Sequence, residues 1–193
     1  MLVFILGLVL FLGVHSVSIV VPGWRAAQVA RRGVGAWKGF YAAVSAVGFV
    51  LLVSGYAMAR REPVVLYSPP AGLRHLALLL MLPVFPLLFA AYLPGRIRRV
   101  TKHPMLLAVK IWATAHLIAN GTLVDVVLFG SFLAWAVADR ISLGRRFLPE
   151  SHEPALSRAG KYNDAAAVVG GLAVYVLFLF RAHQWLIGVS PLA

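Results

Sequence analysis

Long apolar stretches alternate with short basic connections along the whole chain. Six of them are candidates for membrane-crossing helices: about 2–21, 39–58, 74–93, 104–120, 123–139 and 164–187. A helix needs roughly 20 mostly apolar residues to cross the hydrocarbon core. Only helices and closed barrels satisfy the backbone in lipid, and these stretches lack the alternation of strands. We therefore predict an all-α fold: a polytopic integral membrane helical bundle, one domain over residues 1–193 with about six transmembrane helices.

The polar connections and the small residues add detail to this bundle. Residues 24–38, WRAAQVARRGVGAWK, are basic, flanked by tryptophan and too polar to cross, which predicts a short interfacial helix on the inner leaflet. Pro83 and Pro86 should kink the third span. Thr122 and Asp125 fit a capping box, so we expect Asp125 to be a helix cap near the outer surface and not a buried catalytic acid.

Small residues in the second and sixth spans predict close packing between helices. In the second span they are Ala42, Ala43, Ser45, Ala46 and Gly48, and in the sixth Ala165, Ala166, Ala167, Gly170 and Gly171.

The distribution of charge indicates orientation. The chain is 61% hydrophobic and 12% charged, with a net charge of +12. Lys and Arg concentrate in the first, third and fifth connections, which the positive-inside rule places in the cytoplasm. Both termini are then periplasmic, in a bacterial inner membrane. This pattern favours contact with lipid headgroups over nucleic-acid binding. The absence of cysteine excludes disulfides and thiolate metal sites.

Histidines inside the apolar spans are the strongest candidates for chemistry. His15 lies in the first span and His116 in the fourth, and neither has an acidic residue nearby in its own span. Ionisable groups at such depth are costly and mark functional sites. His103 and His116 are thirteen residues apart, roughly 19 Å along a helix, so they cannot share one metal. His15 and His116 differ in predicted depth by roughly 10 Å, which makes them the most favourable pair.

A bis-histidine haem b is the cofactor that this sparse set of ligands fits best. Zinc and di-iron sites need further histidines or carboxylates at the same depth. A haem needs only two axial imidazoles. Trp112 and Asn120, one turn on either side of His116, are candidates to pack the macrocycle or orient the ring. Lys110 shares the helix face of His103 and is a candidate to bind the cofactor near its propionates. The remaining histidines, His75, His152 and His183, are expected to have no role in the site.

Three segments in order resemble the NnrU family over essentially the whole chain. They are LGLVLFLGVHS, KHPM with the downstream WATAH, and AWAVADRISLGRR. That family is related to 15-cis-zeta-carotene isomerase, an integral membrane enzyme that uses haem b. The resemblance implies His15 and His116 as axial ligands, with His103 at the cytoplasmic mouth of its span near the propionates. It also implies a link to denitrification and nitric oxide metabolism.

The sequence leaves several functions open, and with them the question of whether the protein is an enzyme. The first is a haem b membrane protein with nitric oxide as a ligand. The alternative is a haem-dependent cis–trans isomerase acting on an apolar polyene. A second alternative is a membrane methyltransferase of the isoprenylcysteine type, for which His103 and a partial motif form the basis. That motif comprises Glu150, Glu153, Leu156, Gly160 and Tyr162. A transporter or assembly factor without chemistry is the last.

Overall fold

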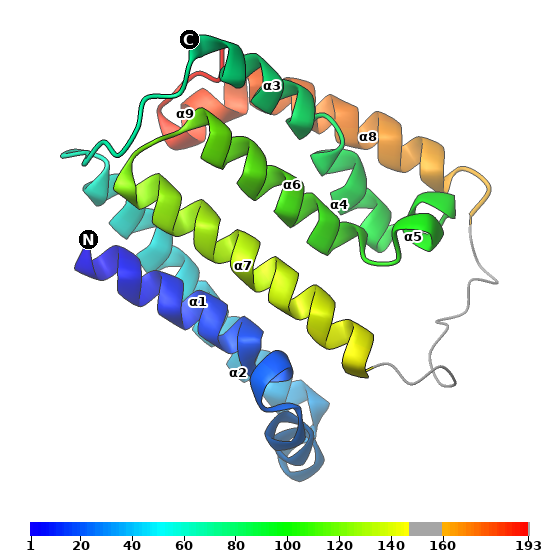
Figure 1. Cartoon of the computed structure of the whole chain (residues 1–193). Coiled ribbons are helices and arrows are strands. Elements are labelled where there is room, and N and C mark those ends of the chain that lie inside the picture. Colours follow the sequence, from blue (N-terminus) through cyan, green and yellow to red (C-terminus); the bar gives the residue numbers. More distant parts are fainter. Residues whose placement is uncertain (147–159, 193) are drawn as a thin grey trace. The chain divides into compact units, whose positions relative to one another are not determined.

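The computed structural model of the chain (Figure 1) describes residues 1–146 and 160–192. These residues form helices and contain no strand, apart from one isolated antiparallel bridge between Val65 and Thr122. The chain divides into two compact units, Met1–Tyr67 with Gly121–Ser142 and Ser68–Asn120 with Leu143–Ala193.

The predicted all-α membrane fold is confirmed, with one adjustment to the helix count. Five helical stretches are long and apolar enough to cross a membrane: Leu2–Val20, Pro22–Ala59, Ala71–Tyr92, Leu123–Arg145 and Asn163–Ile187. The expected span at 104–120 is a helix of 16 residues, Pro104–Ala119. At 1.5 Å per residue it extends for only about 24 Å. The six predicted spans are thus five long helices and one shorter apolar helix.

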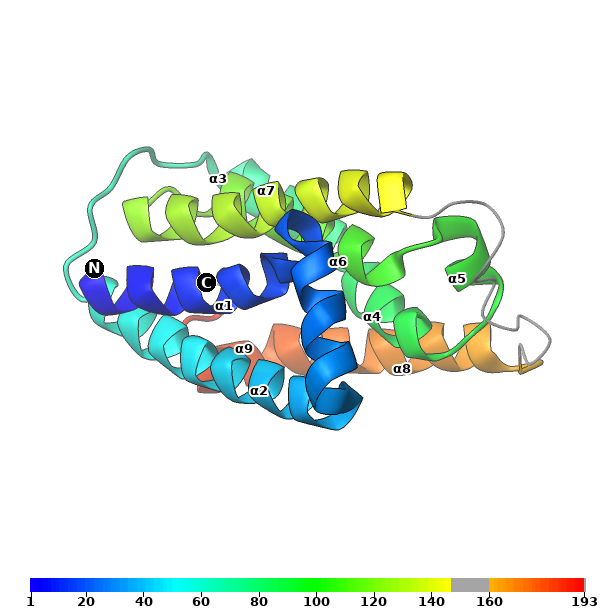
Figure 2. The same ribbon diagram turned by 90° about the horizontal axis from the view of Figure 1, so that it is seen from below.

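Three helices build the first unit: α1 (Leu2–Val20), α2 (Pro22–Ala59) and α7 (Leu123–Arg146). Aromatic rings join α7 to α1, because Phe11 and Phe132 lie 5.8 Å apart between ring centroids. A hydrogen bond from Tyr56 to Asp125 joins α7 to α2. Figures 1 and 2 both show the three helices side by side. The unit is therefore a small bundle with α1 in contact with both of its neighbours.

Helices α1 and α2 are antiparallel and approach each other at glycines. A Cβ atom added at Gly48 would lie 2.7 Å from the backbone N of Phe11. A Cβ at Gly7 would lie 2.6 Å from Leu52 Cα, and one at Gly55 2.8 Å from the carbonyl carbon of Val3. Only glycine leaves room for backbones this close. The prediction for Gly48 is confirmed, whereas the neighbouring Ala42, Ala43 and Ala46 are exposed on another face of α2.

Helix α2 consists of two segments separated at Gly33. This residue has φ 82° and ψ 158°, a conformation that is essentially restricted to glycine. The first segment, residues 22–32, runs across the direction of α1 in Figure 2. The indole rings of Trp24 and Trp37 meet edge to face at 5.8 Å across the break. The short helix predicted at 24–38 is present but ends earlier, because residues 34–38 lie beyond the break and belong to the second segment of α2. Its place on the inner leaflet stays a prediction.

The predicted motif at the start of α7 is present, with Thr122 as the residue whose hydroxyl accepts the backbone N–H of Asp125, but the Asp125 side chain is buried. Its carboxylate accepts a hydrogen bond from Thr122 Oγ1 (2.5 Å), and its backbone N–H donates to the same hydroxyl (3.4 Å). The Tyr56 hydroxyl of α2 donates to the other carboxylate oxygen (2.6 Å), which leaves Asp125 only 6% exposed. The Arg60 guanidinium lies over the Tyr56 ring. A tertiary contact thus buries a residue whose local motif indicates only a cap.

The second unit is built around a kinked helix. Its helices are α3 (Ala71–Met81), α4 (Val84–Tyr92), α5 (Arg96–Thr101), α6 (Pro104–Ala119), α8 (Asn163–Leu177) and α9 (His183–Ile187), with the π-helical turn η2 (Phe178–Ala182) between the last two. The predicted kink is confirmed, because α3 ends at Met81 and α4 begins after Pro83. Here the Leu82 N–H donates a hydrogen bond to Leu79 O instead of Leu78 O. The Tyr175 hydroxyl donates to Leu78 O (3.0 Å). The tyrosine thus satisfies a carbonyl that the kink removes from the regular helical pattern.

Helix α4 contacts both α6 and α8 in this unit. Val84, Leu87 and Ala108 form the buried core between α4 and α6. On the side of α8, a Cβ at Gly171 would lie 2.5 Å from Pro86 Cα, and Ala167 has no exposed surface. The prediction that the small residues of the last span allow close packing is confirmed at these two positions.

Candidate functional site

His15 occupies a defined position on α1, with one ring nitrogen fixed by the backbone. Its Nδ1 lies 2.6 Å from the carbonyl oxygen of Phe11, one turn earlier. Since a carbonyl oxygen can only accept, Nδ1 carries the proton of this hydrogen bond. In the neutral ring the lone pair is then on Nε2. The His15 side chain is half-buried, and Nε2 is the nitrogen available to a metal.

Aromatic side chains from all three helices of the first unit surround the His15 ring. The ring centroid of Phe11 lies 4.3 Å away, that of Tyr41 5.0 Å and that of Trp135 6.0 Å. These three residues are called the His15 aromatic cluster below. They are not among the site residues predicted from the sequence. The position of Phe11, one helical turn before His15, could have been predicted from the sequence. Tyr41 and Trp135 join the cluster only through tertiary packing.

Trp135 has a property that the rest of the cluster lacks. Its indole Nε1 is buried and has no hydrogen-bond partner among the described residues. The indole plane is at 88° to the His15 ring, an edge-on contact. An indole N–H can only donate, and buried donors in native proteins nearly always have an acceptor. The first unit therefore contains an unsatisfied donor next to the candidate ligand.

His116 repeats the local geometry of His15 on α6 of the second unit. Its Nδ1 lies 2.8 Å from the carbonyl oxygen of Trp112, so this nitrogen also carries the proton and Nε2 the lone pair of the neutral ring. The Trp112 ring lies 5.3 Å from the imidazole and packs against the core of the unit. Asn120 also contacts His116, through hydrogen bonds from its side-chain amide (3.0 Å) and its backbone N–H (2.9 Å) to the His116 carbonyl. Trp112 and Asn120 thus hold the helix end that carries the ring.

The two candidate ligands share one arrangement. Each is half-buried in an apolar helix, each donates Nδ1–H to the carbonyl four residues earlier, and each has the aromatic side chain of that residue beside it. His15 belongs to the first unit and His116 to the second. Both residues were predicted from the sequence, and the surroundings of each ring are defined within its own unit.

His103 and Lys110 lie on the same helix as His116. His103 is the N-cap residue of α6, directly before Pro104, and its side chain makes no capping hydrogen bond. Lys110 lies in the middle of α6 and is half-buried. The separation between His103 and His116 is thus that of opposite ends of one helix, which agrees with the argument that they cannot share a metal.

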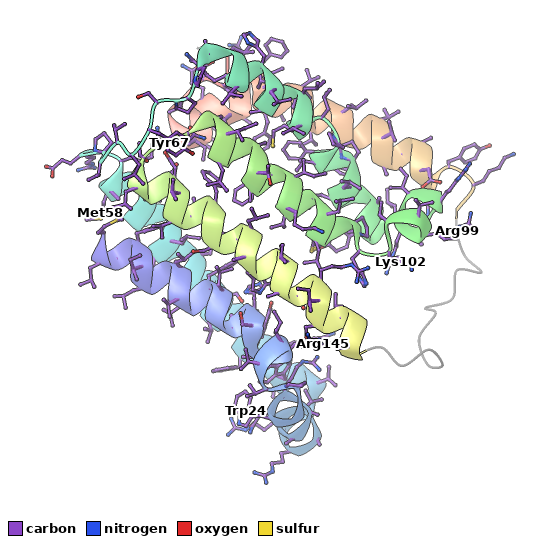
Figure 3. The ribbon with its side chains drawn as sticks, in the orientation of Figure 1. Trp24, Met58, Tyr67, Arg99, Lys102 and Arg145 are labelled. Atoms are coloured by element: carbon purple, nitrogen blue, oxygen red, sulfur yellow. The ribbon has the colours of Figure 1, made fainter. Side chains whose placement is uncertain are left out.

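A basic helix precedes His103 in the second unit. The backbone N–H groups of Arg96 and Ile97 donate to the carboxylate of Asp164 (2.8 and 3.0 Å), which caps the first turn of α5. Arg99 and Lys102 follow on the same short segment (Figure 3). Asp164 thereby ties this basic turn to the start of α8.

The other predicted positions add no ligand to either histidine. His75 is exposed on α3, and Nδ1 of His183 donates to the Val189 carbonyl (2.6 Å). No group of three potential metal-binding side chains occurs in the part of the chain that the structure describes. His152 and three residues of the methyltransferase-like motif, Glu150, Glu153 and Leu156, lie outside the described residues.

Comparison with known proteins identifies the family. Neither the solved structures nor the curated protein sequences contain a significant match to the chain. The family model described as NnrU protein matches residues 3–191, which include both structural units. The match covers nearly the whole sequence and agrees with the apolar helices of the structure. The chain therefore belongs to the NnrU family of membrane proteins.

Proposed function

We propose that the protein binds haem b in the membrane, with His15 and His116 as the axial ligands. The observation that carries the proposal is the shared hydrogen bond from Nδ1–H to the preceding turn. Metal-binding histidines usually donate their second ring N–H to a carbonyl or carboxylate, which sets the tautomer and orients the ring. Both histidines have this support before any ligand is considered.

The chemistry of the surroundings also suits a haem better than a bare metal ion. Aromatic side chains contact both imidazoles, so the surroundings of each ring are apolar. An apolar macrocycle bound to these imidazoles would require such surroundings. Further metal ligands are not clustered with them among the described residues. A porphyrin brings four nitrogens and leaves two positions for imidazole. When bound, the haem would supply a redox-active iron, which His15 and His116 would hold.

The proposed setting is denitrification and nitric oxide metabolism, on the strength of family membership. In this setting nitric oxide would be the ligand of the bound haem. Haem-dependent cis–trans isomerisation of a polyene is the competing activity, implied by the resemblance described above. Both require the same two histidines, so a test of haem binding comes before a test that separates them.

The experiment is a set of absorption spectra of the purified protein in mild detergent, oxidised and reduced with dithionite. The variants are His15→Ala and His116→Ala, with His75→Ala as the control because this histidine is exposed on α3. We expect sharp α and β bands in the reduced wild type and the control, and loss or broadening of these bands in both ligand variants. A wild-type protein that stays colourless after reconstitution with haem would refute the proposal.

Haem binding, once observed, allows the two activities to be separated. Nitric oxide added to the reduced protein is expected to shift the Soret band at stoichiometric concentration. A cis-polyene in detergent micelles is expected to keep its isomer composition under the same conditions. Conversion to the trans isomer, dependent on both histidines, would instead support the isomerase.

We also propose that the chain lies in the inner membrane of a bacterium with both termini in the periplasm. The support is the concentration of Lys and Arg in alternate connections. Since the chain contains no cysteine, single-cysteine variants report accessibility without background. Glu62→Cys is expected to react with an impermeant maleimide in spheroplasts, and Lys102→Cys and Lys161→Cys only after permeabilisation. The opposite labelling pattern would show that the chain has the inverse orientation in the membrane.

A further inference from the structure

The buried indole N–H of Trp135 is the one feature of the His15 aromatic cluster that packing does not explain. Phe11 and Tyr41 contact His15 through their rings, as an apolar cluster requires. The Trp135 indole lies at 88° to the imidazole, and its Nε1 is shielded from solvent without an acceptor among the described residues. A phenylalanine would provide the same apolar contact without leaving a buried donor unsatisfied.

A bound molecule is the source of acceptor that accounts for this arrangement. An indole nitrogen donates and cannot accept, so the partner must carry a lone pair. Leaving such a donor buried and unpaired is unfavourable, so a ligand that supplies an acceptor gains binding free energy. Trp135 and His15 lie on neighbouring helices of one unit with ring centroids 6.0 Å apart, so a molecule as wide as a haem held by His15 would be within reach of Trp135.

The chemistry of haem b restricts which of its atoms this donor can meet. The four pyrrole nitrogens are occupied by the iron, and the methyl and vinyl substituents are hydrocarbon. The two propionate carboxylates are the strong acceptors on the periphery. A hydrogen bond from an uncharged donor to a carboxylate is also stronger than one to a neutral acceptor.

We propose that Trp135 is a cofactor-binding residue whose indole Nε1–H donates a hydrogen bond to a propionate of the haem held by His15. This inference rests on the proposed haem binding. It assigns a role to helix α7, which contributes neither of the two candidate axial ligands. It also explains why a tryptophan is found beside the imidazole.

The test compares haem b with its dimethyl ester, in which both carboxylates are blocked and the macrocycle is otherwise retained. Full-length protein in mild detergent is titrated with each compound, for wild type, Trp135→Phe and the control Trp37→Phe. Trp37 is a buried tryptophan of the same unit that contacts Trp24 and Phe40. The dissociation constants and the positions of the Soret bands are the readouts.

We expect wild type and Trp37→Phe to bind haem b more tightly than the ester. Trp135→Phe should bind haem b about tenfold to a hundredfold more weakly than wild type, the range for a hydrogen bond to a charged group. Its affinity for the ester should be unchanged. Only in Trp135→Phe, therefore, do we expect the preference for haem b over the ester, measured as the ratio of their affinities, to be reduced.

Two results would overturn the inference and leave haem binding intact. One is a Trp135→Phe variant that keeps the wild-type ratio. The other is a wild-type protein that binds haem b and the ester equally well, a comparison that needs no variant to fold. Failure of the wild type to bind either compound would overturn the proposed function and this inference together.

Discussion

The substitution Gly55→Ala tests the closest approach of α1 and α2. A Cβ atom at this position lies 2.8 Å from the carbonyl carbon of Val3 and closer still to the backbone N and Cα of Phe4. Ordinary contacts of a Cβ begin near 3.4 Å. Because the opposing atoms are backbone, no change of rotamer relieves the clash. The helices must separate locally, and Phe4, which is fully buried, must lose part of its packing.

The expected magnitude follows from two opposing effects. Overpacking of a close interface costs about 1–3 kcal/mol. Alanine in place of glycine within a helix gains about 1 kcal/mol. We therefore expect the free energy of unfolding to fall by up to about 2 kcal/mol. The measurement is titration of the purified protein from mild detergent into dodecyl sulfate, followed by far-UV circular dichroism.

The same helices supply matched controls. Gly13 on α1 and Gly39 on α2 have no atom within 4 Å of an added Cβ. Gly13→Ala and Gly39→Ala are expected to keep or raise the free energy of unfolding, by at most about 1 kcal/mol. The sign of the effect thus differs between buried and open glycines. If Gly55→Ala were as stable as Gly13→Ala, the described register of α1 and α2 would be wrong.

Three further substitutions test other parts of the structure. Tyr56→Phe removes the hydrogen bond to Asp125 and should lower the free energy of unfolding by about 1 kcal/mol in the same titration, whereas unchanged stability would contradict the contact. Gly33→Ala forces a glycine-only conformation and should cost about 1–3 kcal/mol and weaken the near-UV signal of the Trp24–Trp37 pair, so an unaltered signal would speak against the break. Asp164→Ala removes the cap of α5 and should speed amide hydrogen exchange at residues 96–101, and unchanged exchange would disprove that role.

Hydropathy alone predicted the fold class, because a lipid environment imposes one requirement on every apolar stretch. Backbone groups in the hydrocarbon core must be satisfied within the segment, so a long apolar stretch is a helix wherever it packs. The kink at Pro83 was equally predictable, since proline removes a donor from the helix that contains it. The existence of a short helix before Gly33 also follows from the polar composition of that segment. Each of these is a property of a local segment.

The face on which a helix meets its neighbour was decided by tertiary structure. Small residues allow close helix packing wherever they occur in a helix. The rotation of α2 about its axis places Gly48 and Gly55 against α1 but leaves Ala42 and Ala43 exposed. The same reason explains Asp125. Its capping motif is local, whereas its burial depends on Tyr56, which is 69 residues away in the sequence.

The candidate ligands themselves are visible in the sequence, because an ionisable group in an apolar span is costly wherever that span packs. The hydrogen bonds that orient His15 and His116 are also local, since each joins residues four apart on one helix. Trp135 beside His15 is different. No pattern within α7 indicates which helix its indole faces, and an unsatisfied donor is recognised only once the surrounding atoms are placed. Local chemistry thus determined which residues are exceptional, and the packing of distant helices decided what lies next to them.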